Sequence, residues 1–155
     1  MKPLKTVVLN EMKLIGIRVV CPGDQYVYEI PKASHALKER LNEIRNVVSP
    51  ARVVGAFIAG DFTEEEDGYW VCVEVNEVRD VPKGMVSLLV PKQKYAVITH
   101  TGTKHEIRNT YELLHKWIKD NGFERIQRSW HLEIAEEWGK KDVGEEHIDL
   151  YDTIK

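Results

Sequence analysis

Runs of apolar and β-branched residues recur along the chain at lengths typical of β-strands. Turn-forming residues bound these runs; Pro22 and Gly23, for example, follow the first of them. The pattern predicts six strands, at residues 13–20, 52–59, 69–75, 95–101, 130–134 and 147–154.

Two further segments carry apolar residues at helical spacing. The first predicted helix covers residues 32–48, with Pro31 in its first turn and Ser49-Pro50 after its end. The expected buried face of this helix consists of Ala33, Leu37, Leu41, Ile44 and Val48.

The second predicted helix covers residues 104–121. Thr103 and Glu106 have the spacing of a capping box, in which each side chain satisfies a free backbone N–H group. Gly122 suits the left-handed stop that follows many helices. The expected buried face consists of Ile107, Tyr111, Leu114 and Ile118.

The order of these elements is strand–helix–strand–strand, and it occurs twice, at about residues 12–78 and 94–155. One such unit covers only one face of a small sheet, so two units are expected to share a longer antiparallel sheet with both helices on one face. We therefore predict an α+β fold built from a tandem β-α-β-β duplication, with a central ligand groove between the halves. Residues 1–155 are expected to form a single domain.

Composition excludes several classes of function. The 155 residues carry a formal net charge of −3 and are 43% hydrophobic, as in an ordinary soluble protein. No phosphate-binding motif and no basic patch interleaved with aromatic residues occurs, so we expect neither a cofactor nor direct nucleic-acid binding. With no long apolar segment, no signal-peptide pattern and only two cysteines, the chain is expected to be cytoplasmic and to stay out of the membrane.

A family pattern covers nearly the whole chain. Residues 90–123 contain a proline, a Tyr-Ala-Val strand, a His/Gly turn and a helix with a Thr-Tyr pair and a late Trp. Glu133 lies on a later strand, Tyr151 on the closing strand and Tyr69 at an aromatic position of an earlier one. Together these features resemble the GyrI-like effector-binding domain family. The matching residues within 90–123 are Pro91, Tyr95, Ala96, Val97, His100, Gly102, Thr110, Tyr111, Trp117 and Gly122.

The resemblance implies a tandem β-α-β-β fold with a central pocket for small, often aromatic and cationic molecules. In AraC- and MerR-type multidrug regulators this domain is the drug-sensing half. It also occurs alone, in gyrase-inhibitory proteins and in proteins that hydrolyse reactive electrophiles. Because the strand pattern begins near residue 5, we expect a stand-alone domain without a helix-turn-helix. Ala135 departs from the family, which often has an aromatic residue there.

Glu133 is the strongest candidate for a functional residue, because it interrupts an apolar strand between Leu132 and Ile134. A carboxylate on the inner face of a sheet is costly unless a partner compensates its charge. A cationic ligand would do so; alternatively, a buried Glu133 would act as a general base on water. The alternation of a half-exposed strand would equally place Glu133 in solvent beside His131. The family resemblance favours the pocket.

Large aromatic residues are the candidate walls of this pocket, because rigid rings attract flat cations. Tyr69 and Trp70 point to opposite faces of their strand, and the family position favours Tyr69. Simple core packing is the alternative role for each ring. The candidate ligand-binding residues are Glu133, Tyr69, Tyr111, Trp130, Tyr151 and Trp138, the last as a lid.

Three functions follow. The first is the binding of a hydrophobic or aromatic, cationic small molecule for sequestration or sensing; the second is a hydrolase that uses Glu133 as its catalytic base. The third is a gyrase-inhibitor-like interaction with a protein partner, in which the acidic loop at residues 61–68 is a possible contact, and a homodimer is also possible. A metal site of His100, His105, His131 and Glu133 is disfavoured, because His105 is expected to face water.

Overall fold

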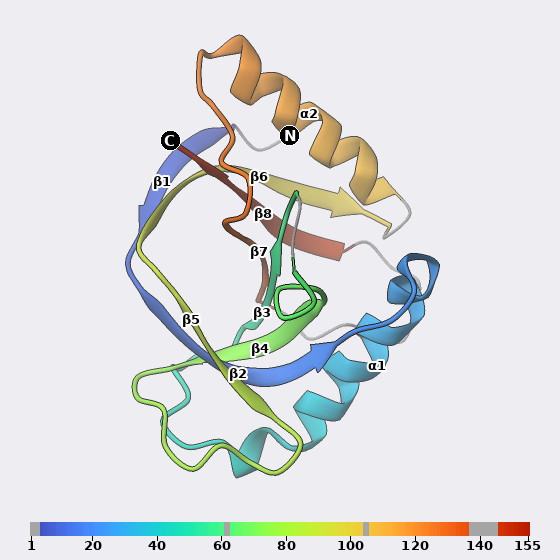
Figure 1. The fold of residues 1–155 in the computed structure, drawn as a ribbon, viewed down its shortest axis with the longest axis vertical. Helices are drawn as coiled ribbons and strands as arrows, with labels where there is room; N and C mark the ends of the chain where they lie inside the picture. Colours follow the sequence, from blue (N-terminus) through green and yellow to red (C-terminus); the bar gives the residue numbers. More distant parts are fainter. Residues whose placement is uncertain (1–3, 61–62, 104–105, 137–145) are drawn as a thin grey trace.

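The computed structural model describes residues 4–60, 63–103, 106–136 and 146–155. Eight strands and two α-helices lie in these ranges (Figure 1). The α-helices are α1 (Tyr26–Glu39) and α2 (Ile107–Asp120), and two short 3₁₀ turns flank α1 at Gly23–Gln25 and Leu41–Glu43. The strands are β1 (Lys5–Leu9), β2 (Met12–Val19), β3 (Val53–Ile58), β4 (Tyr69–Val75), β5 (Val86–Val90), β6 (Gln93–Gly102), β7 (Trp130–Ala135) and β8 (Glu146–Ile154).

All eight strands belong to one antiparallel sheet with the order β1-β6-β8-β7-β3-β4-β2-β5. The two predicted units occupy equivalent places in it: β6, β8 and β7 on one side of the centre, β3, β4 and β2 on the other. The two units therefore meet where β7 pairs with β3. The predicted α+β class and the antiparallel sheet with two helices are confirmed.

The strands β1 and β5 were not among the six predicted strands, although a strand pattern was expected to begin near residue 5, and they close the sheet. β1 and β2 run against β6 and β5 in a single register, from Lys5 opposite Val97 to Gly16 opposite Val86. The resulting ribbon curves along one side of the molecule and links its two halves (Figure 1). Short strands such as these have little periodicity of their own, and long-range pairing with each other decides their conformation.

The sheet separates three hydrophobic clusters. One lies on the face away from the helices and includes Leu14, Val54 and Leu132, all fully buried. A second lies under α1 around Leu37, and a third lies under α2 around Leu114. Both helices therefore cover the same face of the sheet, one on each half, and the strand pair β7–β3 lies between them (Figure 1).

The first helix differs from its prediction. It begins at Tyr26 and ends at Glu39, whereas residues 32–48 were predicted, and Pro31 lies inside it rather than in its first turn. Ile44 is buried in the same cluster as Leu37 although the helix has already ended. The turn that follows α1 packs against the same sheet, so apolar residues at helical spacing continue beyond the end of the helix. This continuation made the predicted helix too long at its C-terminal end.

The second helix keeps its predicted position but not its predicted cap. Thr103 Oγ1 donates to Glu106 Oε1 at 2.9 Å, so these two side chains bond to each other, and among the described residues neither bonds a backbone N–H group. The main-chain N–H of Glu106 donates to the carbonyl of Thr103 at 3.1 Å. In the described ranges, neither helix is long and apolar enough to cross a membrane.

Candidate functional site

The candidate site lies on β7, at the centre of the sheet. Leu132 and Ile134 point into the cluster on the face away from the helices. Because side chains alternate along a strand, His131 and Glu133 point to the other face, between α1 and α2. Glu133 is only partly exposed there, so its carboxylate needs polar partners.

Two tyrosine hydroxyls supply partners for Glu133. Tyr69 Oη donates to Oε1 at 2.6 Å, and Tyr111 Oη donates to Oε2. Tyr69 comes from β4 in the first half of the chain, whereas Tyr111 comes from α2 in the second. Tyr69 and Tyr111, which are far apart in sequence, therefore both bond the carboxylate of Glu133, and all three were predicted site residues.

Gly55 makes the contact between Tyr69 and Glu133 possible. In the sheet, Gly55 lies on β3 directly opposite Glu133. A Cβ atom at position 55 would lie 1.8 Å from the hydroxyl oxygen of Tyr69 and 2.4 Å from its Cζ atom. The Tyr69 ring thus crosses β3 over a residue without a side chain. A glycine inside a strand often marks a position where another group approaches the backbone closely. The glycine in the predicted strand at residues 52–59 was therefore a sequence signal for such a contact.

The Tyr111 hydroxyl is held in its protonated form. Burial, followed by the negative charge of Glu133, raises the pKa of Tyr111 well above its ordinary value. The neighbouring phenol therefore remains a hydrogen-bond donor across the physiological pH range. Hydrogen bonds to a carboxylate favour its ionised form, so the arrangement presents a negative charge among aromatic rings.

A row of stacked rings extends from Tyr69 along the same face. Phe57 stacks on Tyr69 with ring centroids 5.9 Å apart, and it also stacks on His131 with centroids 5.7 Å apart. In the sheet, Phe57 lies opposite His131, just as Gly55 lies opposite Glu133 two residues away on the same face. The site therefore combines a carboxylate with a continuous aromatic surface.

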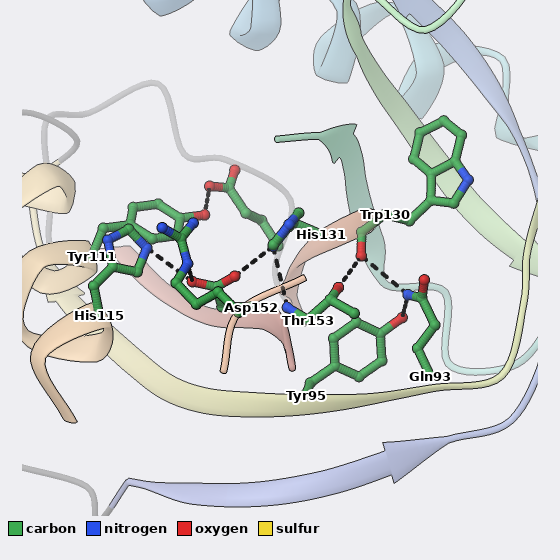
Figure 2. A network of polar contacts seen from close by, with 10 residues as sticks. Gln93, Tyr95, Tyr111, His115, Trp130, His131, Asp152 and Thr153 are labelled. Carbon is green, nitrogen blue, oxygen red and sulfur yellow. Dashed lines mark hydrogen bonds and ion pairs between the residues drawn. The ribbon is translucent and has the colours of Figure 1, made fainter. Parts of the chain in front are cut away.

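A second polar network surrounds Asp152 on β8 (Figure 2). Its Oδ2 atom lies 2.8 Å from Arg125 Nε and 2.9 Å from His115 Nε2, and its Oδ1 atom lies 2.8 Å from His131 Nδ1. Burial alone would raise the pKa of Asp152, but the contact with His131 and the charge of Arg125 outweigh it and hold that pKa below its ordinary value. Burial and the charge of Arg125 lower the pKa of His115.

Two predicted ligand-binding residues lie elsewhere. Trp130 and Tyr151 pack against the cluster on the face away from the helices, so the structure does not bring them to Glu133. Trp130 packs edge-on against Trp70 at 5.0 Å, and Tyr151 against Tyr95 at 5.7 Å. The physical reason is strand alternation: Trp130 is three residues from Glu133 and therefore points the opposite way. Trp138 lies outside the described residues.

The described residues include no group of three or more His, Cys, Asp or Glu side chains that could hold a metal ion. Both ring nitrogens of His100 are already hydrogen-bonded, Nδ1 to Thr110 Oγ1 at 2.6 Å and Nε2 to the carbonyl of Thr103 at 2.8 Å. His100 therefore joins the end of β6 to the start of α2. His105 lies outside the described ranges.

Sequence reasoning missed several residues of this face. Gly55 and Phe57 on β3, and the partners of Asp152, were not predicted to contribute. Asp152 had a usable signal, because it is an acidic residue in the closing strand at a position that alternation assigns to the helix side. Arg125 and His115 had no comparable signal in the sequence. They contact Asp152 only because the fold places β8 beside them.

Comparison with known proteins identifies the class. The family of integron-associated effector binding proteins matches residues 5–154, and the chain belongs to this family. The similarity confirms the GyrI-like effector-binding domain that the sequence resembled.

Particular relatives are a transcriptional regulator and two proteins of known structure. A 45-residue segment is 48% identical to the transcriptional regulator BrlR of Pseudomonas aeruginosa; it covers 29% of this chain and 17% of BrlR. The structure of EcmrR in a DNA complex matches with a TM-score of 0.74 and 18% identity, over 99% of this chain and 57% of EcmrR. SAV2435 bound to tetraphenylphosphonium matches with a TM-score of 0.72 and 15% identity, over 99% and 94% of the two chains. This chain therefore spans only part of BrlR and part of EcmrR.

Proposed function

We propose that this protein binds a small, hydrophobic, aromatic and cationic molecule on the sheet face between α1 and α2, for sequestration or sensing. The observation that carries the proposal is the Glu133 carboxylate, which accepts hydrogen bonds from Tyr69 and Tyr111 in an aromatic setting. Glu133 supplies the negative charge, and the rings of Tyr69, Phe57 and Tyr111 supply the walls. We place this activity in the cytoplasm, in keeping with two free cysteines.

Charge and rings favour the same kind of ligand. A cation beside Glu133 gains Coulomb energy that the partly buried setting strengthens relative to water. The faces of the neighbouring aromatic rings attract the same cation through their quadrupoles. SAV2435, which shares the fold, was determined with tetraphenylphosphonium, an aromatic cation of this kind. That ligand is therefore a suitable probe for this chain.

The decisive experiment is calorimetric titration with tetraphenylphosphonium and with tetraphenylborate, which has nearly the same shape and the opposite charge. We expect wild type to bind the cation and not the anion. The Glu133→Gln substitution should weaken cation binding at least about tenfold, as the loss of one close charge pair predicts. Glu124→Gln is the matched control, because this exposed carboxylate pairs with Lys155 near the C-terminus. Equal affinity of Glu133→Gln and wild type would overturn the proposal.

A hydrolase is the second candidate, because a carboxylate and a protonated phenol lie side by side. Water would attack an electrophilic carbon of the ligand while Glu133 accepts the water proton. The phenol of Tyr111 would donate its proton to the leaving atom and later regain one from Glu133. Mass spectrometry of a reactive probe, such as an aryl epoxide, would test this. Addition of one water that Glu133→Gln abolishes would support a hydrolase, and an unchanged probe would reject it.

The gyrase-inhibitor-like interaction and the homodimer stay predictions, because no contact among the described residues bears on them. Supercoiling assays with purified gyrase would test the first. Sedimentation equilibrium would test the second.

A further inference from the structure

One edge of β2 is left without a partner strand over its C-terminal part. β5 pairs with residues 12–16 of β2, and its first residue, Val86, lies opposite Gly16. The main-chain N–H of Met85, the residue before, donates to the carbonyl of Pro82 at 3.0 Å, so the chain turns here and does not continue the strand. Among the described residues, no other strand pairs with this edge. Beyond Gly16 the edge of β2 is therefore open.

Main-chain hydrogen-bonding groups face this open edge. The carbonyl oxygen of Val19 lies against Gly68, on the side of β4, since a Cβ atom at Gly68 would be 2.7 Å from it. Successive residues of a strand direct their N–H and C=O groups to opposite edges. The groups of Arg18 and Val20 therefore point away from β4, to the side that β5 leaves free. Such an edge is a template for pairing with a further extended segment.

A groove runs along the open edge. It has a volume of about 380 Å³ and lies between residues 17–21, at the end of β2, and one side of α1 (Figure 1). Ile17 and Val19 belong to the apolar cluster under this helix. Ala33 and Ala36 line the helix side, where their short side chains leave room. Domains that bind extended peptides by strand addition combine an open edge with pockets for every second side chain.

The two faces of the sheet differ in polarity at this end of β2. Ile17 and Val19 point to α1, whereas Arg18 points to the other face, with its guanidinium 4.9 Å from the centroid of the Trp70 ring. The guanidinium of Arg18 also holds the acidic turn at residues 63–67 by donating to main-chain carbonyls. These are the carbonyls of Glu64 (2.8 Å), Glu65 (3.2 Å) and Asp67 (2.6 Å). A strand added beside β2 would present one row of side chains to the apolar groove and the other to the acidic turn.

Negative charge predominates around the groove. The carboxylates there are those of Asp24, Glu29, Glu64, Glu65 and Asp67. Burial, followed by the charges of Glu29, Asp24 and Asp67, raises the pKa of the Cys21 thiol at the end of the groove. The cations that line the groove, Lys32 and Arg18, offset only part of this charge. A second copy of this chain would bring the same carboxylates together, so like-charge repulsion disfavours it as the partner.

We propose that the open edge of β2 binds an extended, basic segment of a partner protein, which lies antiparallel to β2 and takes the place that β5 leaves. Apolar side chains at every second position of the segment fill the groove beside Ala33 and Ala36. The lysine or arginine residues between them face the acidic turn. Main-chain hydrogen bonds with Arg18 and Val20 set the register. This site is on β2 and not on β7, so the inference does not depend on the proposed function.

The capped peptide acetyl-KVKVKV-amide is the probe, and its N-methylated forms test strand addition. Residues opposite each other in an antiparallel pair share a face, so the lysines lie opposite Arg18 and Val20 and carry the amides that bond β2. N-methylation of the lysines should weaken binding at least about tenfold, as the loss of two hydrogen bonds predicts. N-methylation of the valines should change it little. The acidic peptide acetyl-EVEVEV-amide should not bind, because its charges repel those of the turn.

Titration followed by amide NMR suits the weak affinity that so short an edge predicts. The amide signals of Arg18 and Val20 should shift with acetyl-KVKVKV-amide, and their hydrogen exchange should slow. Those of Tyr69 and Glu133 should stay in place, and excess tetraphenylphosphonium should not displace the peptide.

Two variants test the groove itself. Ala36→Phe fills the groove from the helix side and should weaken binding of acetyl-KVKVKV-amide at least about tenfold. Its matched control is Asn109→Phe, at an exposed position on α2, which should bind like wild type. Replacing both Glu64 and Glu65 by Gln should weaken binding roughly fivefold at low salt, as the loss of two exposed charge pairs predicts. Thermal melts confirm that each variant is folded.

Several results would overturn the inference. Equal binding of the lysine-methylated and unmethylated peptides would exclude strand addition, and equal binding of the acidic peptide would exclude the basic partner. Absence of acetyl-KVKVKV-amide binding at millimolar concentration would reject the site. If sedimentation equilibrium showed a dimer that Ala36→Phe dissociates, the edge would pair with a second copy instead. Displacement of the peptide by tetraphenylphosphonium would assign its binding to the face around Glu133.

Discussion

The two faces of β7 differ in what they contribute to the molecule. Leu132 and Ile134 are almost fully buried in an apolar cluster that links both halves of the sheet. Glu133, between them in sequence, bonds two tyrosines on the other face. The apolar face gains stability from area removed from water, whereas the polar face holds a charge whose partners come from β4 and α2. One strand therefore supports the fold on one side and the candidate site on the other.

The largest effect should come from the apolar face. Leu132→Ala removes a fully buried side chain at the centre of the sheet and is expected to cost about 2–5 kcal/mol in the free energy of unfolding. Urea unfolding measures this loss. Glu133→Gln, one residue away, should change the free energy of unfolding far less, although it abolishes charge recognition. If the two substitutions were equally destabilising, the division between the faces would be wrong.

The next effect concerns Asp152, the buried charge of the polar face. Asp152→Asn should cost about 1–3 kcal/mol at pH 7, a modest value because Arg125 and His115 are partly exposed and water screens them. Since folding lowers the pKa of Asp152, its contribution is present above the unfolded pKa of about 3.9 and is lost as pH falls through the folded value. The unfolding free energies of wild type and Asp152→Asn should differ at pH 7. They should converge once the pH falls below the folded pKa of Asp152, which lies under its ordinary value.

A smaller effect is expected at Gly55, where the two halves touch. Gly55→Ala should cost about 1–2 kcal/mol, because the new methyl group displaces the Tyr69 ring. If Tyr69 is the cause, Gly55→Ala should cost much less when Tyr69 is also replaced by Ala. A double-mutant cycle of thermal unfolding measures this coupling. If the losses in unfolding free energy from the two substitutions were strictly additive, the effect of Gly55→Ala would not come from contact with Tyr69.

The smallest effect is a change in titration. Comparison of wild type with Tyr111→Phe by alkaline ultraviolet absorbance should show that Tyr111 ionises only well above the ordinary pKa of tyrosine. In Glu133→Gln the pKa of Tyr111 should fall but stay raised, because burial is the larger cause and remains. A pKa that did not respond to Glu133→Gln would contradict the contact between the two side chains.

Local patterns predicted most of the secondary structure. The strand at residues 69–75 has the predicted bounds, and the order of helices and strands in both halves is confirmed. Periodicity succeeds here because each element buries one face, which leaves its period in the sequence. The duplication of residues 12–78 and 94–155 fits the symmetric strand order but stays a prediction.

The candidate site was predicted only in part. Glu133, Tyr69 and Tyr111 were named from the family resemblance, and the structure brings them together. Trp130 was placed with them although its distance from Glu133 along the strand already excluded a shared face. Alternation within one strand is local information and could have prevented this error.

By itself, the sequence determined most of the elements, their order and the family, because these depend on local spacing and on motifs. Only the tertiary structure decided that Gly55 lets Tyr69 reach Glu133, that β1 and β5 close the sheet, and that Asp152 holds His131. Each of these contacts joins residues far apart in the chain. The register of strand pairing sets them, and no single stretch of sequence carries that register.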